Sequence, residues 1–257
     1  MERRVLAGGV RVLVPSAIEA EGFLVAFTER SGGVSRDAFA SLNLGLRCGD
    51  EPANALENRQ RLCRALGIPS FSLARQVHGA RLARAGSEDA GAGFDDPATA
   101  LGNADGVVTA SSGVALAVLT ADCVPVVLAD PSTGQVAVVH AGWRGVARGV
   151  VRSALSCFDD PSAVLAAIGP GVGPDHYEVG EEVAAAVSAA LPGTAATNRS
   201  ASRLLLDLPA TVANMLSALG VRAIEREDAC TACEPQRFFS HRRDGTTGRQ
   251  GVVAMRR

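Results

Sequence analysis

The chain has 257 residues, of which 47% are hydrophobic and 20% are charged. Together with a mean hydropathy of +0.16, this composition predicts a folded globular protein and excludes an intrinsically disordered one. The 25 basic and 27 acidic side chains nearly balance. Sequence-independent binding to nucleic acid phosphates therefore has little electrostatic support, and we expect no nucleic-acid partner.

Helix-like and strand-like segments follow one another without a regular alternation, and no stretch between them has the composition of an interdomain linker. We therefore predict a single domain spanning residues 1–257. In chain order, the patterns predict a strand at Phe23–Thr28, a helix at Pro52–Leu66, a loop at Ala85–Gly102, strands at Gly106–Thr109, Val114–Thr120, Val124–Asp130 and Gln135–His140, a helix at Gly145–Phe158, a strand at Ala163–Ile168, a helix at Glu181–Leu191, a loop at Gly193–Ser202, a helix at Leu208–Leu219 and a strand at Gly251–Met255.

The basic residues are all Arg, because the sequence contains no Lys. This excludes Schiff-base chemistry and a P-loop lysine. The six cysteines do not form the dense framework of a small secreted domain, which favours reduced thiols. Arginines interrupt the N-terminal apolar stretches, and no apolar run approaches the length of a membrane span. We expect a cytoplasmic protein with no membrane partner.

A cysteine and a histidine lie on two consecutive strands that we expect to form a hairpin. If Pro131 and Ser132 make a two-residue loop, Cys123 faces His140 on the same side of the sheet. Facing side chains are close enough for a thiolate and an imidazole to share one metal ion. A four-residue loop would instead set Cys123 opposite Gly142 and leave it without this partner.

His78 is the natural third ligand, because it stands in the polar, Gly-containing stretch Gln76-Val77-His78-Gly79. Zinc held by three protein ligands retains an open position for water or substrate, which is the arrangement of a catalytic site. The alternative is that these residues have only structural roles and bind no metal. A histidine at a strand end is commonly an ordinary hydrogen-bonding residue, and a buried cysteine commonly behaves as a small hydrophobic side chain.

Two further segments have features of anion sites. The glycines around Trp143-Arg144 would place a helix N-terminus beside the metal, unless this is only a tight connection between strand and helix. The segment Phe238–Arg249 combines three arginines with Ser and Thr hydroxyls, which suits an anion but also suits a solvated turn. Cys230-Thr231-Ala232-Cys233 has the spacing of a zinc knuckle, yet no second ligand pair follows, so we interpret it as structural.

Taken together, these motifs resemble the YfiH/YlmD family, also called the laccase-domain or multicopper polyphenol oxidase family. They occur in the family's order and span nearly the whole chain. The resemblance implies an α+β fold, a layered sandwich of mixed β-sheets covered by helices. The motifs are Ser41-Leu42-Asn43-Leu44-Gly45, Gln76-Val77-His78-Gly79, Ala104-Asp105-Gly106, Thr120-Ala121-Asp122-Cys123-Val124-Pro125, His140-Ala141-Gly142-Trp143-Arg144-Gly145 and the segment from Phe239 to Arg249.

The resemblance implies zinc at His78, Cys123 and His140, with purine nucleosides and phosphate as substrates. The implied activities are phosphorolysis of adenosine, inosine and methylthioadenosine, together with adenosine deamination. Copper is the less favoured metal, and four histidines cannot supply the ligands of a true multicopper laccase. Where many members carry cysteines, this chain reads Pro174-Asp175-His176-Tyr177, so we expect that a secondary metal or redox role assigned through those cysteines does not transfer.

The resemblance also suggests roles for neighbouring residues. In deamination, zinc would activate a water for attack on C6 of adenine while Asp122 moves protons, provided that the strand bends at Asp122. In phosphorolysis, Arg243 is our first candidate for anion binding, with Arg144 and Asn43 as further substrate contacts.

Two other functions use the same residues. Cys123 activated by His140 would make a metal-free cysteine hydrolase or amidase, and some relatives have been linked to removing wrong amino acids from cell-wall peptidoglycan precursors. A purely structural zinc in a nucleoside-binding or partner-binding module is the non-enzymatic alternative.

Overall fold

The structure is a computed structural model that describes residues 1–200 and 202–257. One sheet is five-stranded, and all of its neighbouring strands are antiparallel. In spatial order its strands are β1 (Glu2–Val5), β2 (Arg11–Val14), β3 (Phe23–Thr28), β13 (Gln250–Arg256) and β6 (Leu116–Thr120).

The second sheet is six-stranded and mixed. Its inner strand pairs are antiparallel, whereas the outer pairs β12–β9 and β4–β5 are parallel. A separate hairpin consists of β10 (Ala196–Ser200) and β11 (Arg203–Asp207). In spatial order the strands of the six-stranded sheet are β12 (Ala223–Arg226), β9 (Leu165–Ile168), β7 (Val124–Asp130), β8 (Gln135–Ala141), β5 (Gly106–Thr109) and β4 (Leu82–Arg84).

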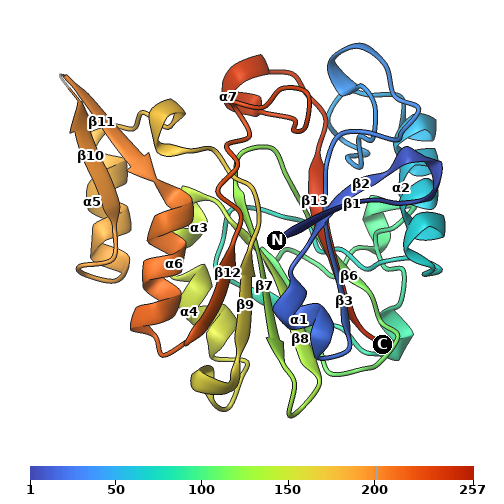
Figure 1. The fold of residues 1–257 in the computed structure, drawn as a ribbon, viewed down its shortest axis with the longest axis horizontal. Helices are drawn as coiled ribbons and strands as arrows, with labels where there is room; N and C mark the ends of the chain where they lie inside the picture. Colours follow the sequence, from blue (N-terminus) through green and yellow to red (C-terminus); the bar gives the residue numbers. More distant parts are fainter. Residues whose placement is uncertain (201) are drawn as a thin grey trace.

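Helices cover the outer faces of the two sheets (Figure 1). The α2 helix lies on the side of the five-stranded sheet, and α4 and α6 lie on the opposite side of the molecule, beyond the six-stranded sheet. The predicted α+β sandwich of mixed sheets covered by helices is therefore confirmed. The helices are α1 (Ser16–Ala20), α2 (Pro52–Leu66), α3 (Trp143–Ala147), α4 (Val150–Leu155), α5 (Glu181–Ala190), α6 (Leu208–Ala218) and α7 (His241–Asp244).

The alternation along β7 shows how the layers are held together. Val126 and Leu128 face the helices that cover the six-stranded sheet, whereas Val127 and Ala129 face the five-stranded sheet. Because both faces are covered, every residue of β7 is buried, and the strand reads as an almost continuous apolar run. A third apolar cluster packs α2 against the outer face of the five-stranded sheet.

Two sequence predictions were wrong. The helix expected at Gly145–Phe158 is divided into α3 and α4, because Gly149 takes a left-handed conformation with φ of 88°. The loop expected at Gly193–Ser202 contains β10, which pairs with β11 although its composition is polar; residue 201 lies outside the described residues. The single-domain assignment stays a prediction.

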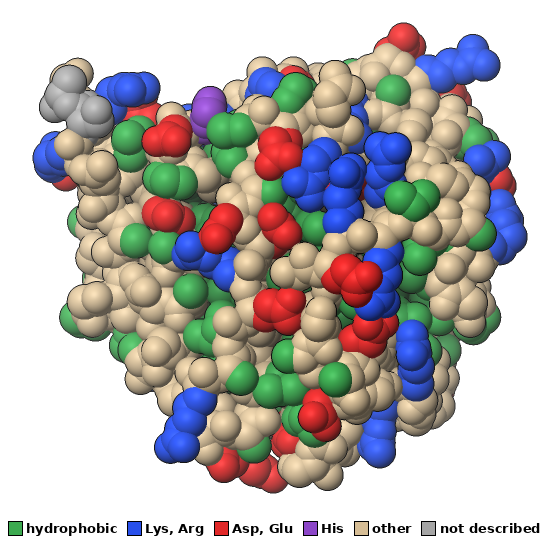
Figure 2. Space-filling view, viewed as in Figure 1, with side chains coloured by type: hydrophobic (Ala, Val, Ile, Leu, Met, Phe, Trp, Pro, Cys, Tyr) green, Lys and Arg blue, Asp and Glu red, His purple; other side chains and the backbone are tan. Residues whose placement is uncertain are grey.

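The surface is mixed in charge on the face shown in Figure 2, where acidic side chains lie among the basic ones. No helix in the described part of the chain is long and apolar enough to cross a membrane.

Candidate functional site

The chain crosses from one sheet to the other between β6 and β7. Strand β6 ends at Thr120 in the five-stranded sheet, and β7 begins at Val124 in the six-stranded sheet. Asp122 turns the chain between them with φ of 91°, a left-handed conformation that Asp adopts more readily than most residues. The proton-transfer role considered for Asp122 depended on a bend at this residue, and the bend places Cys123 just before β7.

The β7–β8 hairpin has the longer of the two loops considered for it, so the two-residue loop that would set Cys123 opposite His140 does not occur. The loop has four residues, Pro131 to Gly134, so that Asp130 pairs with Gln135 and Pro125 with His140. The backbone N–H of Gly134 donates to the carbonyl of Asp130 at 2.8 Å, and the φ of 71° at Gly134 suits a glycine. Cys123 therefore lies outside the strand pairing and approaches His140 through the bend at Asp122.

Three donor atoms nevertheless converge. The ligand atoms of His78, Cys123 and His140 all lie within 4.8 Å of one another, and the Sγ of Cys123 is 3.9 Å from Nε2 of His78. The two imidazole rings meet edge to face with centroids 4.8 Å apart. Among residues 1–200 and 202–257, no fourth Cys, His, Asp or Glu side chain joins this cluster. The arrangement suits one metal ion with an open coordination position.

Asp105 holds both histidines of the cluster in place. Its buried carboxylate accepts backbone N–H groups from Val77, His78 and Gly79 at 3.1, 2.9 and 2.6 Å, which fixes the loop that presents the His78 ring. The same carboxylate lies 2.9 Å from Nδ1 of His140. A carboxylate behind a ligating histidine orients the ring and raises its basicity, which is common around metal sites.

The cluster also favours separated charges on Cys123 and His140. Burial opposes the ionised thiol, but the neighbouring His140, together with hydrogen bonding to both histidines, lowers the pKa of Cys123 to about 6. Burial likewise opposes the imidazolium, yet Cys123 and Asp105 raise the pKa of His140 to about 9. In the absence of a metal, both shifts favour the form in which Cys123 is a thiolate and His140 an imidazolium.

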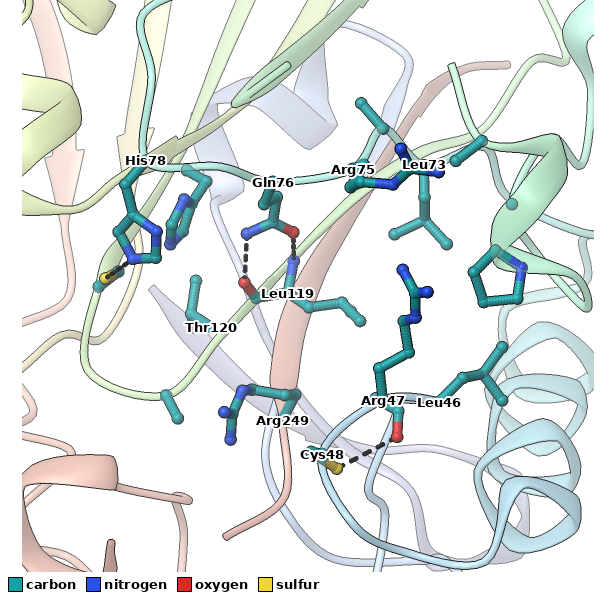
Figure 3. Close-up of a pocket in the computed structure, with 18 of the residues that line it drawn as sticks. Leu46, Arg47, Cys48, Leu73, Arg75, Gln76, His78, Leu119, Thr120 and Arg249 are labelled. Atoms are coloured by element: carbon teal, nitrogen blue, oxygen red, sulfur yellow. Dashed lines mark hydrogen bonds between the residues drawn. The ribbon is translucent and has the colours of Figure 1, made fainter. Parts of the chain in front are cut away.

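A cavity of about 620 Å³ opens from the cluster, within the size range of small-molecule sites. His78 lies at one end of it, and Arg47 and Arg75 lie further along (Figure 3). Gln76 bonds both ways to the backbone of Leu119, donating at 2.8 Å and accepting at 2.8 Å, and so holds the His78 loop against β6. The basic side chains that line the cavity are Arg47, Arg59, Arg75, Arg144 and Arg249.

Thr120 provides an unpaired hydroxyl at this cavity. Its side chain is 2% exposed, and Oγ1 has no hydrogen-bond partner within the residues that the structure describes. A buried hydroxyl without a partner costs free energy, and such groups in native proteins call for an explanation. Thr120 is among the residues that line the cavity, although its Oγ1 atom is itself covered by protein.

Of the residues predicted to contact the substrate or move protons, some line the cavity and others bond only to the protein around it. Arg144 lines the cavity and lies 4.5 Å above the Trp143 ring. The carboxylate of Asp122 accepts the Thr231 hydroxyl and the Arg242 backbone N–H, each at 2.6 Å.

Asn43 and Arg243 are likewise committed to contacts within the protein. Asn43 is buried, and its side-chain oxygen accepts the backbone N–H groups of Gly45 and Arg249. Arg243 donates to the carbonyl oxygens of Thr231, Ala232 and Phe238.

Comparison with known proteins identifies the family of the chain. The family described as multi-copper polyphenol oxidoreductase laccase matches residues 24–257. The protein named purine nucleoside phosphorylase Rv2149c of Mycobacterium tuberculosis is 44% identical over 229 residues, covering 86% of this chain and 87% of the relative. The protein named purine nucleoside phosphorylase YfiH of Escherichia coli is 38% identical over 242 residues, covering 93% and 96%. The crystal structure of YlmD from Geobacillus stearothermophilus matches with a TM-score of 0.88 and 38% identity, covering 92% of each chain.

The chain belongs to the YfiH/YlmD laccase-domain family. In this laccase-domain chain, sequence reasoning did not single out Asp105, Thr120, Arg47 and Arg75 as site residues. Asp105 and Thr120 do occur in two of the recognised motifs, and this was the available signal. No local pattern marks Arg47 and Arg75, because tertiary packing alone brings them to the cavity.

Proposed function

We propose that this chain is a zinc-dependent purine nucleoside phosphorylase that also deaminates adenosine. Its substrates would be adenosine, inosine and methylthioadenosine, with inorganic phosphate as the second reactant. The observation that carries the proposal is the three-donor cluster at one end of an arginine-lined cavity. Relatives named purine nucleoside phosphorylase, 44% and 38% identical to this chain, support it.

The donor set fits zinc. One thiolate and two imidazoles are ligands that zinc prefers, with copper as the alternative, and Asp105 provides the supporting carboxylate. When bound, the ion would supply Lewis-acid chemistry at the open position. Asp105 also determines the proton position on His140, because a proton held on Nδ1 leaves Nε2 free to ligate.

For phosphorolysis, a phosphate oxygen forms a bond to C1′ of the ribose, and the bond from C1′ to the purine nitrogen breaks. The electron pair leaves with the purine, which takes up a proton. Guanidinium groups bind phosphate in a bidentate manner, and we assign this task to Arg47, Arg75 and Arg249. Arg144 would contact substrate beside the cluster, and the unpaired hydroxyl of Thr120 would bond to substrate inside the cavity.

We assign positioning roles to three of the predicted site residues. Asp122 anchors the bend before Cys123 through Thr231 and Arg242, so its oxygens are committed. Asn43 holds the backbone at Gly45 and Arg249, which line the cavity. Arg243 braces the turn that contains Thr231.

The test is incubation of the purified protein with adenosine, with and without phosphate, and identification of the products. We expect adenine that depends on phosphate, inosine that does not, and about one zinc bound through Cys123. Cys123→Ser should remove this zinc and both activities, whereas Cys157→Ser, a half-buried cysteine outside the cavity, should remove neither. Activity that persists in metal-free Cys123→Ser protein would refute the proposal.

A cysteine hydrolase is the second candidate, favoured by the charge separation at the same cluster. The Cys123 thiolate would attack a carbonyl carbon, and His140, oriented by Asp105, would give its proton to the leaving group; water would then cleave the thioester and return the thiolate and the imidazolium. Chelation separates the two functions. Activity on amide substrates that survives chelation but is lost on thiol alkylation would establish the hydrolase instead.

A further inference from the structure

The Cys230-Thr231-Ala232-Cys233 segment forms a tight turn. The backbone N–H of Glu234 donates to the Cys230 carbonyl at 3.2 Å, and Arg243 donates to the carbonyl oxygens of Thr231 and Ala232 at 2.8 and 3.2 Å. The turn brings the Sγ atoms of Cys230 and Cys233 within 4.8 Å of each other, and both cysteines are free thiols. The two sulfur atoms are therefore available to one ligand.

A histidine from a distant part of the chain completes the group. His176 ends a short 3-10 turn, Pro174–His176, that lies 54 residues before Cys230. Its Nδ1 is 3.4 Å from the Sγ of Cys233 and 4.0 Å from the Sγ of Cys230. The sequence offered no second ligand pair for this cysteine motif, but the fold supplies a single imidazole instead.

These separations match a tetrahedral metal site. Zinc–sulfur and zinc–nitrogen bonds of about 2.3 and 2.0 Å at tetrahedral angles place sulfur and nitrogen about 3.5 Å apart. Two thiolates and an imidazole favour zinc over hard cations such as magnesium. We propose that His176, Cys230 and Cys233 form a second metal site, which binds Zn²⁺ or a similarly thiophilic divalent cation.

The surroundings of Cys230 suit a metal-bound thiolate. The backbone N–H of Gly173 donates to the Cys230 Sγ at 3.1 Å. A Cβ atom at Gly173 would lie only 3.1 Å from the Cys230 Cβ, so the absence of a side chain permits this approach. Hydrogen bonds to ligating atoms hold them in position and stabilise the ionised sulfur. Cys233 and His176 are exposed, so an ion can enter from solvent.

The ion would connect two segments that pack around the first cluster. Thr231, between the two cysteines, donates its hydroxyl to Asp122, the residue before Cys123. Tyr177 follows His176, and its ring lies 5.1 Å from the guanidinium of Arg242, whose backbone N–H also bonds to Asp122. The second ion therefore has a structural role, because it joins the loop after β9 to the segment before α7 at Asp122.

Cobalt binding to a Cys123→Ser protein tests this site without involving the first one. We expect the reduced Cys123→Ser protein to bind one equivalent of Co²⁺ with thiolate-to-cobalt charge-transfer absorption. Adding Cys233→Ser or His176→Ala should abolish that absorption, whereas adding Cys157→Ser should leave it unchanged. His176→Cys should restore binding, because three thiolates also form a metal site.

Three results would overturn the proposal. The first is the absence of charge-transfer absorption in reduced, folded Cys123→Ser protein. The second is absorption that persists after both Cys233→Ser and His176→Ala, which would place the ion elsewhere. The third is a Cys230–Cys233 disulfide found by mass spectrometry in protein prepared anaerobically with reductant. Because Cys123 is absent throughout, these results do not depend on the catalytic proposal.

Discussion

Gly142 lies against the side chains of Cys123 and His78. A Cβ atom at this position would be 2.9 Å from the Cys123 Sγ and 3.0 Å from Cδ2 of His78. Gly142→Ala must therefore shift two of the three donor side chains, the thiol of Cys123 and the ring of His78. We expect a loss of metal affinity of roughly 10- to 100-fold, the size of effect seen when the support of a ligand is disturbed. Titration against a competing chelator measures it.

Gly79→Ala is the matched control for that substitution. The added Cβ would meet Asp105 Oδ2 at 3.4 Å, which is an ordinary contact, although Gly79 belongs to the same site. Equal metal affinity in the two variants would show that the close approach at Gly142 has no role in the cluster.

Replacing Thr120 by valine should have opposite effects on stability and on catalysis. Thr120→Val removes a buried hydroxyl that has no partner, so the free energy of unfolding should rise by about 1 kcal/mol. If the hydroxyl binds substrate, kcat/KM for adenosine phosphorolysis should fall about tenfold. Thr109→Val is the control, because Thr109 Oγ1 already donates to the Ala85 carbonyl at 2.8 Å. Thr109→Val should lower the free energy of unfolding. If Thr120→Val leaves kcat/KM unchanged, the Thr120 hydroxyl does not contact the substrate.

At the scale of single residues, the sequence reveals the candidate metal ligands but not the residues that hold them in position. His78, Cys123 and His140 could be selected because histidine is scarce and because their motifs resemble those of the family, whereas the two-residue hairpin loop that would pair Cys123 with His140 does not occur. The buried carboxylate of Asp105 joins the His78 loop to the His140 ring across 26 to 35 positions in the chain. His176 is similarly separated from Cys230. Such contacts arise from tertiary packing and leave no local pattern.

The turn between β7 and β8 sets the register of these two strands. The Asp130 carboxylate accepts the backbone N–H of Ser132 at 2.8 Å and the hydroxyls of Ser132 and Thr133 at 2.7 and 2.9 Å. These bonds stabilise a four-residue loop that ends at Gly134. A Pro-Ser pair after an aspartate is also compatible with a shorter loop, so the sequence left the register open.

This turn should make stability dependent on pH. Burial opposes ionisation of Asp130, but hydrogen bonds from Ser132 and Thr133 lower its pKa below the usual value. A lowered pKa in the folded state gives stability that is complete above the unfolded pKa of about 3.9 and lost as pH falls through the folded pKa. Asp130→Asn should therefore lower the free energy of unfolding by about 1 kcal/mol at pH 7, and by less below pH of about 4.

Urea denaturation between neutral and acidic pH measures this difference. Asp160 provides the comparison, because it begins a second Asp-Pro-Ser turn and accepts the Ser162 N–H at 2.8 Å, but is exposed. Asp160→Asn should have a smaller effect at every pH. A difference between wild type and Asp130→Asn that stays constant with pH would contradict the assignment.

The sequence predicts helices and strands well where buried apolar residues recur at a regular spacing. The bounds of β3, β5, β7 and α2 agree with the apolar patterns. Strand β1 was missed because Glu2-Arg3-Arg4-Val5 is polar and lies at the edge of its sheet. It is held by pairing with β2 and by ion pairs, neither of which has a hydrophobic period.

At the scale of the whole molecule, Glu29 joins segments from the two ends of the chain. Its buried carboxylate follows β3 and accepts two hydrogen bonds from Arg3 in β1, at 2.8 and 2.7 Å, and one from Arg237 at 2.7 Å. Arg237 precedes α7, so this ion pair connects the first strand to the segment that leads back into the five-stranded sheet. Glu29→Ala would leave two guanidinium groups without their shared partner.

We expect Glu29→Ala to lower the free energy of unfolding by about 3 kcal/mol, near the lower end for breaking a buried pair, because Arg3 can regain water. Urea denaturation of Glu57→Ala gives the comparison. Glu57 also pairs with two arginines, Arg61 and Arg64, but on the exposed face of α2, where such pairs contribute less than about 1 kcal/mol. Equal losses in the two variants would mean that burial of Glu29 does not strengthen this connection. A larger loss for Glu29→Ala, with β1 exchanging its amide hydrogens first, would show that the ion pair holds the first strand in the sheet.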